Sequence, residues 1–177
     1  MLPHTGKRCG LVWSVDTARA KGLLGLDDDV FLALAEDGAF LEHARVFDHR
    51  YGTGRAAVEE LLAAGFDVIL DIDWQGARQI RRSFSGCVTI FIVPPSLEIL
   101  QQRLARRGQD SEATIRRRMR DARAEISHWD EFDHVVINDD FEDALEDLRA
   151  IVREGRPRRS IDPDRQRLIL AELLETG

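Results

Sequence analysis

The sequence predicts an α/β fold built on a parallel sheet, because short apolar strands alternate with amphipathic helices along most of the chain. Three apolar runs are expected to be strands: FDVILDID, CVTIFIV and HVVIN. Residues with helical spacing separate them, over roughly 74–84, 96–107 and 111–128. The apolar part of the first string, residues 68–70, is short, β-branched at two positions and flanked by charge, which is typical of a strand buried on both faces of a parallel sheet.

The elements around this alternating core are expected in the following order. DDDVFLALAEDGAF predicts a helix with Asp residues ahead of it and Gly38 at its end. FLEHARVFDHRYGT favours two short antiparallel strands, and RAAVEELLAAG a helix stopped by Gly65. Residues 141–154 and 163–175 predict two further helices joined by a polar connection. Residues 1–27 show no sustained period, and only 11–15 suggest a short strand there.

Composition narrows the class of protein. The chain has 177 residues, 44% hydrophobic and 32% charged, which suits one globular domain. A formal charge of -7 argues against bulk binding of nucleic acid. Cys9 and Cys87 form no metal pattern and are expected to be free thiols in a reducing cytoplasm. We find no signal peptide and no apolar run long enough for a membrane helix, and the sequence does not predict an oligomeric state.

Asp71 ends the first apolar run, so its carboxylate is expected at the carboxyl edge of the sheet. Ligands of open α/β sheets bind at that edge, and an Asp in this place commonly helps to hold Mg²⁺ in phosphoryl-transfer proteins. The alternative interpretation, with about half the weight, is a cap for the helix that begins near Trp74.

Arginines gather on two successive helices joined by the turn GQDSE. They are Arg103, Arg106 and Arg107, followed by Arg116, Arg117 and Arg118. Such a cluster can stabilise charge on a moving phosphoryl group. For any single arginine, an exposed helix face paired with Glu112, Asp121 or Glu125 is the stronger interpretation. For the cluster as a whole we favour phosphate binding.

Four strings carry a resemblance to a known family. They are GAFLEHARVFDHRYGT, AGFDVILDIDWQGARQIR, IFIVPPSLEILQQRLARRGQDSEATIRRRM and VVINDDFEDALEDLRAIV. Together they resemble guanylate kinase from about residue 28 to the end, roughly five-sixths of the chain. The segment LDIDWQGA, followed by PPS and RLxxRGQDSE, is highly specific to that family.

The resemblance implies a P-loop-kinase-like parallel sheet with flanking helices, a small GMP-binding lobe and a helical lid. Residues 1–27 would then be an atypical N-terminal segment, and 28–177 the kinase-like domain. Within it the resemblance implies the following parts: 28–65 the GMP-binding lobe, 66–107 core, 108–128 the lid region, and 129–177 core and C-terminal helices. The implied reaction is transfer of phosphate from ATP to GMP, with Mg²⁺, giving ADP and GDP.

The resemblance also implies roles for individual residues. Glu42, Thr53 and Asp73 would read the guanine base, and Tyr51 would contact the GMP phosphate. A carboxylate can accept the N1 and N2 protons of guanine, and a hydroxyl can donate to O6. From residue types alone, these four residues would not be distinguished from ordinary polar side chains of the surface or the core. The implied catalytic residues are Arg103, Arg107, Arg118 and Asp71, and Asn138 would lie on the adenine side of the ATP site.

The N-terminal part departs from the family pattern. No GxxxxGK[ST] string occurs, since Gly6-Lys7 is followed by Arg8 with no Gly five positions earlier. The family's Thr-Thr-Arg-x-x-Arg segment is also missing, and Arg50 stands where the family usually has Tyr. We therefore expect an N-terminally truncated or frameshifted family member without the P-loop and without its first strand. That strand is central in the family's sheet, so its loss would leave costly unpaired backbone groups.

Two functions follow for the chain as a whole. The first is an ATP:GMP phosphotransferase by family, whose own activity is in doubt because the phosphate cradle is missing. The second is a non-catalytic guanylate kinase-like fragment that binds GMP or a protein. No dedicated metal site is expected from the residues.

Overall fold

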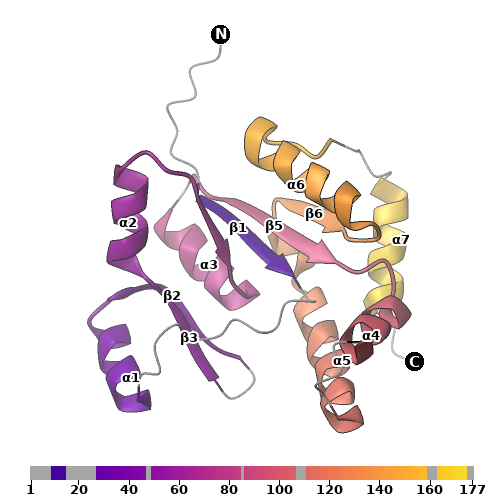
Figure 1. Cartoon of the computed structure of the whole chain (residues 1–177), viewed down its shortest axis with the longest axis horizontal. Coiled ribbons are helices and arrows are strands. Elements are labelled where there is room, and N and C mark those ends of the chain that lie inside the picture. The colour runs from indigo at the N-terminus through magenta and orange to yellow at the C-terminus, as the bar shows by residue number, and fades with distance from the viewer. Residues whose placement is uncertain are drawn as a thin grey trace. The chain divides into compact units, whose positions relative to one another are not determined.

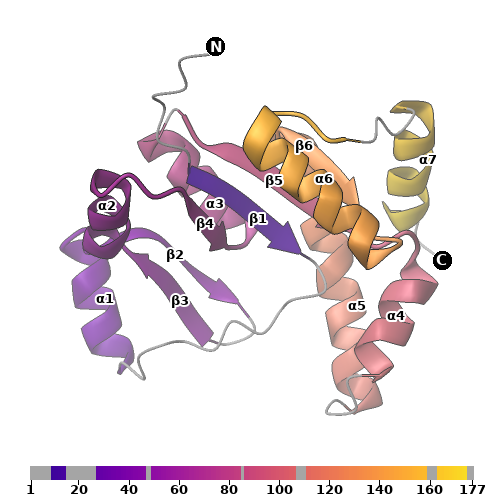
Figure 2. The same cartoon turned by 45° about the horizontal axis from the view of Figure 1, so that its top comes forward.

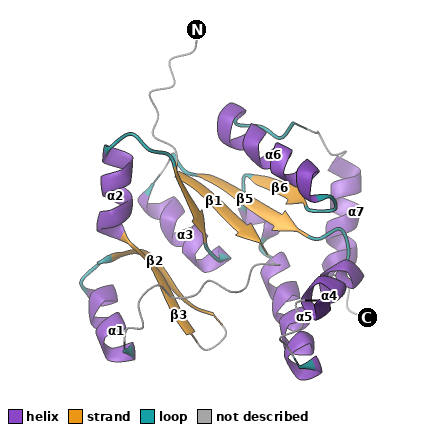
Figure 3. Ribbon diagram, viewed as in Figure 1, coloured by secondary structure: helices purple, strands orange, loops and turns teal. Residues whose placement is uncertain are grey.

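The computed structural model describes residues 9–14, 27–46, 49–84, 86–106, 111–158 and 163–174 (Figure 1). The chain divides into two compact units, one of Met1–Val12 with Arg19–Thr89 and the other of Trp13–Ala18 with Ile90–Gly177. Grey segments in Figure 3 mark the remaining residues. Each unit is described by itself below.

The described residues of the first unit form a hairpin, two further strands and three helices. Its elements are β1 (Cys9–Ser14, which runs on into the second unit), α1 (Asp28–Glu36), β2 (Phe40–Val46), β3 (His49–Gly54), α2 (Arg55–Ala63), β4 (Val68–Asp71) and α3 (Trp74–Ser83). Strands β2 and β3 pair antiparallel, as the sequence predicted. Glu42 lies opposite Thr53 in this pair. Gly38 and Gly65 have φ of +71° and +90° just after α1 and α2, so both expected helix ends are confirmed.

The start of α1 differs from the expected side-chain cap. Asp27 occupies the N-cap position, but its side chain accepts no capping hydrogen bond. Asp28 and Asp29 lie in the first turn instead, where negative charge interacts favourably with the helix dipole.

The second unit contains the other strands and helices. Its elements are β5 (Val88–Val93, beginning two residues before the unit), α4 (Leu97–Arg106), α5 (Glu112–Ile126), the 3₁₀ turn η2 (Trp129–Glu131), β6 (His134–Ile137), α6 (Phe141–Glu154) and α7 (Pro163–Leu174). Helix α4 lies beside α5 (Figure 2), and α5 also contacts α7. The buried core of this unit consists of Phe91, Val93, Leu100, Leu104, Ala122, Ile126, Leu170 and Leu173.

The predicted parallel sheet is confirmed. Its strands follow the order β4-β1-β5-β6, and β6 pairs parallel with β5 from Ile90↔His134 to Val93↔Ile137. Strand β1 pairs parallel with β4, with Cys9 opposite Val68 and Val12 opposite Asp71.

The expectation that the first strand is missing was therefore wrong. Residues 9–14 form β1 between β4 and β5, which is the central position that the expectation left empty. The physical reason is that ladder hydrogen bonds use only backbone groups, so a short segment such as CGLVWS can pair without a family motif. The unpaired backbone expected beside β4 does not arise.

Burial of β4 on both faces was also a wrong expectation. Residues of this strand alternate between buried and exposed, and Ile69 is 60% exposed. Strand β4 is the last strand in the sheet order. An apolar composition makes burial of both faces favourable, but it does not supply the element that would cover the second face.

Candidate functional site

Glu42 and Thr53 form the centre of the candidate site. They are opposite each other in the β2–β3 hairpin, and such cross-strand pairs place their side chains on one face. The Thr53 hydroxyl donates to Glu42 Oε1 over 2.5 Å. Glu42 is only 4% exposed, so its carboxylate has little contact with water. The cross-strand hydrogen bond from Thr53 holds this carboxylate in place.

Asp73 is a second buried carboxylate in the same unit, also 4% exposed. It is the N-cap of α3, and its Oδ1 accepts from the Gly76 backbone N–H at 2.8 Å. Its Oδ2 accepts from Gln75 Nε2 at 3.0 Å. The alternative interpretation of Asp71 as the cap of this helix is therefore wrong, because the cap is two residues further along.

The two buried carboxylates influence each other electrostatically. Burial raises the pKa of Glu42, the negative charge of Asp73 raises it further, and the hydrogen bonds from Thr53 act in the opposite direction. Burial likewise raises the pKa of Asp73, opposed by hydrogen bonds from Gly76 and Gln75. Two buried carboxylates that have little contact with water are suited to accept hydrogen bonds from the N–H groups of a ligand.

These shifts predict how stability depends on pH. Because the folded pKa of Glu42 is raised, the folded state binds more protons than the unfolded state above about pH 4.5, the ordinary glutamate value. Stability contributed by this group is thus present at low pH and lost as pH rises through the folded pKa. We expect Glu42→Gln to raise the melting temperature at pH 7 and to flatten its decline between pH 4 and pH 7. Thermal unfolding of both proteins across that range measures this, and a Glu42→Gln protein that melts lower at pH 7 contradicts it.

Helix α3 approaches strand β2 at a glycine. A Cβ added to Gly76 would lie 2.5 Å from Glu42 Oε2 and 3.1 Å from Glu42 Cδ, closer than real Cβ atoms come. Only glycine therefore lets the Glu42 carboxylate reach the first turn of α3 without a shift. The sequence reasoning missed Gly76, although its place in the string LDIDWQGA was a signal that could have found it.

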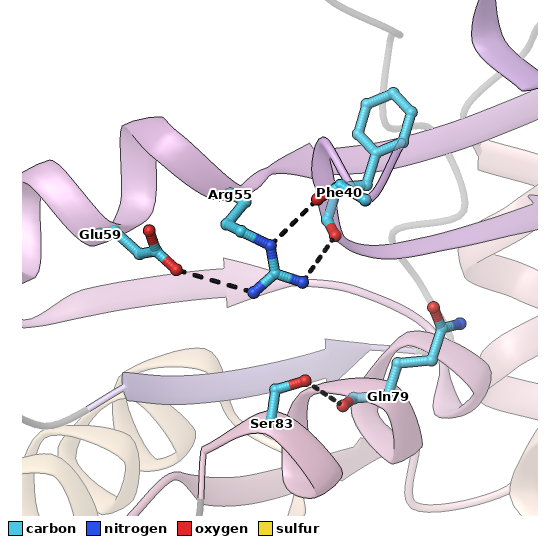
Figure 4. A network of polar contacts seen from close by, with 6 residues as sticks. Phe40, Arg55, Glu59, Gln79 and Ser83 are labelled. Atoms are coloured by element: carbon cyan, nitrogen blue, oxygen red, sulfur yellow. Dashed lines mark hydrogen bonds and ion pairs between the residues drawn. The ribbon is translucent and has the colours of Figure 1, made fainter. Parts of the chain in front are cut away.

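The start of β2 is fixed by further contacts that the sequence did not reveal. Arg55 Nε donates to the Gly38 carbonyl at 3.0 Å, and its Nη2 donates to the Phe40 carbonyl at 3.2 Å (Figure 4). The same guanidinium lies 3.6 Å from Glu59. Phe40 in turn stacks on Phe31 with ring centroids 4.7 Å apart. The strand that carries Glu42 is thereby anchored where it begins.

The other predicted residues of the first unit are less constrained. Tyr51 is half-buried on β3, opposite Ala44. Asp71 is exposed at the end of β4, although its partly enclosed carboxylate has a pKa above the usual range because of desolvation. Arg50 lies 3.3 Å from Asp28, so the arginine that departs from the family pattern is paired with an acid of α1.

Arg103 and Asn138 come together in the second unit. Arg103 Nη2 donates to the carbonyls of Asn138 and Asp139, at 2.9 and 3.3 Å. The Asn138 N–H donates to the Val93 carbonyl at 2.8 Å, which fixes the chain just after β6 to β5. Arg103 therefore braces the loop that carries Asn138.

The remaining arginines of the predicted cluster divide into two groups. Arg118 is half-buried on α5, and Arg107 lies outside the described residues. Arg116 pairs with Glu112 at 3.3 Å, and Arg117 with Asp121 at 3.8 Å, both one helical turn apart and exposed. For those two, the alternative of an ordinary charged helix face is confirmed.

Among the described residues, no group of three or more His, Cys, Asp or Glu side chains is arranged to hold a metal ion by itself. None of the helices described is both long enough and apolar enough to cross a membrane.

Comparisons with known proteins point to one family. A family model described as guanylate kinase matches residues 26–155. A guanylate kinase of Nitrosococcus oceani is 57% identical over 146 residues, which cover 82% of this chain and 72% of that protein. One of Chromohalobacter salexigens is 59% identical over 133 residues, covering 75% of this chain and 62% of that protein. The crystal structure of guanylate kinase from Anaplasma phagocytophilum is similar with a TM-score of 0.67 and 26% identity, over 96% of each chain.

Proposed function

We propose a function from the premise that this chain belongs to the guanylate kinase family: it recognises the guanine base of GMP, the acceptor in phosphate transfer from ATP. The matched part spans 72% and 62% of the two relatives named above, so the full reaction is part of the proposal. As in the family, the reaction would convert GMP to GDP in the cytoplasm, as a step of purine nucleotide metabolism.

One observation carries this proposal: the buried carboxylates of Glu42 and Asp73 and the Thr53 hydroxyl lie in one unit, on the hairpin and at the start of α3. Guanine presents N–H donors at N1 and N2 beside the O6 acceptor, and carboxylates are acceptors only. Adenine offers a ring acceptor at N1 instead, and would leave a buried carboxylate facing a lone pair. Such mismatches are costly, so this set favours guanine over adenine.

Thr53 has to change partner when guanine binds. In the structure its proton is donated to Glu42 Oε1. For the hydroxyl to donate to guanine O6, as the family resemblance implies, it has to rotate away from Glu42. The N–H groups of the base then replace the hydrogen bond that Glu42 loses, so the exchange leaves no buried acceptor unsatisfied.

The remaining roles implied by the family are proposed for the residues of each unit by itself. Tyr51 would contact the GMP phosphate, while Arg103, Arg107 and Arg118 would stabilise charge on the transferred group. Asn138 would lie on the adenine side. Asp71 fits Mg²⁺, because this ion is usually held by one or two carboxylates together with substrate phosphates and water, and Asp71 is exposed. Bound Mg²⁺ would neutralise phosphate charge.

The base preference is directly measurable. We expect calorimetric or NMR titration of the 177-residue protein to show weak binding that prefers guanosine and GMP to AMP by about tenfold or more. We expect little difference between guanosine and GMP, since the Thr-Thr-Arg-x-x-Arg string does not occur in the sequence. Equal binding of AMP and GMP would refute the proposed base recognition. Tight GMP binding that disappears with guanosine would reveal a phosphate site among other residues.

A second candidate function shares the base site but not the chemistry. The 177 residues contain no GxxxxGK[ST] string, which favours a non-catalytic protein of the same family that binds GMP or a protein partner. Titration with guanosine, GMP and AMP does not distinguish the catalytic from the non-catalytic candidate, whereas a measurement of turnover does.

A further inference from the structure

Gln79 on α3 contacts the strand that carries Glu42. Its Oε1 accepts from the His43 N–H at 3.1 Å, and its Nε2 donates to the His43 carbonyl at 2.8 Å. Nε2 also lies 3.3 Å from the Gln75 carbonyl within α3. One amide thus bonds both backbone groups of a residue 36 positions away, as a neighbouring strand would.

These bonds lie on the outer edge of the hairpin. Within the described part of the chain, the sheet of β2 and β3 has two strands, so one edge of β2 has no partner strand there. Both backbone groups of His43 are directed to that edge, because they bond Gln79. His43 is exposed, so these groups could bond water instead, and Gln79 replaces that water with two bonds from α3. The contact therefore fixes both the register and the separation of β2 relative to α3.

The separation matters because Glu42 immediately precedes His43. Glu42 Oε2 reaches the Gly76 backbone so closely that no Cβ fits there, and Gly76 also bonds Asp73. Gln79 lies one turn further along the same helix as Gly76. A small movement of β2 away from α3 would separate the two carboxylates from each other and admit water between them.

We propose that Gln79 is a positioning residue for guanine recognition: by pairing with the His43 backbone it holds strand β2 against helix α3, so that Glu42 and Asp73 face the base together. This inference rests on the proposed function. Preorganised acceptors bind without the cost of ordering them, so loss of the contact weakens base binding even though Gln79 does not touch the base.

Three variants of the full chain test this role. Gln79→Ala removes both hydrogen bonds. Gln79→Glu keeps a good helix former but places a carboxylate oxygen opposite the His43 carbonyl, so it is expected to be at least as harmful. Ser83→Ala is the matched control, because Ser83 lies one turn along α3 and its hydroxyl donates to the Gln79 backbone carbonyl at 3.2 Å, not to β2 (Figure 4).

We expect Gln79→Ala to weaken guanosine binding about tenfold, which is the scale for loss of two ordinary hydrogen bonds that hold one strand. We expect Ser83→Ala to leave guanosine binding unchanged. A second readout needs no ligand: NMR titration of the Glu42 carboxyl. Its pKa is expected to fall toward the ordinary value in Gln79→Ala, because water and distance from Asp73 both lower it.

The two readouts separate this inference from the proposed function. If the unchanged protein shows no guanine preference, the proposed function fails, and the Glu42 titration still decides whether Gln79 positions the carboxylate. An unaltered Glu42 pKa in Gln79→Ala overturns the inference. So does full retention of guanosine binding in Gln79→Glu, because a residue that merely stabilises the helix would tolerate glutamate.

Discussion

The 177-residue protein is expected to form ADP from ATP, Mg²⁺ and GMP at least about 10³-fold more slowly than the 1–100 s⁻¹ typical of kinases. Phosphoryl transfer is catalysed mainly by positioning and by charge placed around the moving group. In P-loop proteins the backbone N–H groups of GxxxxGK[ST] cradle the phosphates, the Lys reaches them, and the Ser or Thr holds Mg²⁺. That string does not occur in these residues.

The size of the effect follows from the number of contributions involved. A single arginine that stabilises the transferring phosphoryl group is worth about 10³–10⁵ in rate. The string would supply a backbone cradle, a cation and a metal ligand together, so their combined loss is expected to be at least as large. A coupled assay for ADP, run with and without GMP, measures this. An Arg118→Ala variant identifies turnover by a contaminating kinase, because contaminant activity would be unchanged. GMP-dependent turnover within tenfold of an ordinary kinase contradicts the prediction and favours the catalytic candidate.

The strongest local patterns predicted the elements of the fold. Helix ends at Gly38 and Gly65 were predictable because a left-handed residue is needed there and glycine adopts it without strain. The hairpin was predictable from its loose alternation, although the shift in its register after Phe40 was not. A short strand was suggested over 11–15, close to β1, but its place in the parallel sheet was not expected, because the sheet was judged by family motifs, whereas a backbone ladder requires none.

The candidate site was predictable only in part. Glu42, Thr53 and Asp73 were expected through a family resemblance, and the structure places Glu42 beside Thr53 and Asp73 in the same unit. A cap role for Asp71 was the alternative interpretation, with about half the weight, but Asp73 is the cap of α3. Gln79 had no signal in the sequence at all. Its contact joins a side chain to a backbone group far along the chain, and periodicity carries no information about such contacts.

Glu42→Gln is expected to reduce guanosine binding by about 10², because a carboxylate that can accept two N–H groups becomes an amide with one acceptor oxygen and one opposing donor. The loss is expected to depend on the ligand. Inosine lacks the 2-amino group of guanosine, so its binding is expected to fall much less. The ratio of guanosine to inosine affinity therefore measures the contact itself, and Glu60→Gln, an exposed glutamate on α2, is the matched control.

Unfolding cannot explain such a loss if the melting temperature rises at the same time. Burial raises the pKa of Glu42, so the charged carboxylate costs folded stability at neutral pH, and its replacement by a neutral amide removes that cost. Guanosine affinity is thus expected to fall and the melting temperature to rise in the same variant. This is the pattern of a buried charge that costs stability but is needed for ligand binding. A variant that melts higher and still distinguishes guanosine from inosine as well as the unchanged protein would show that Glu42 does not read the 2-amino edge of the base.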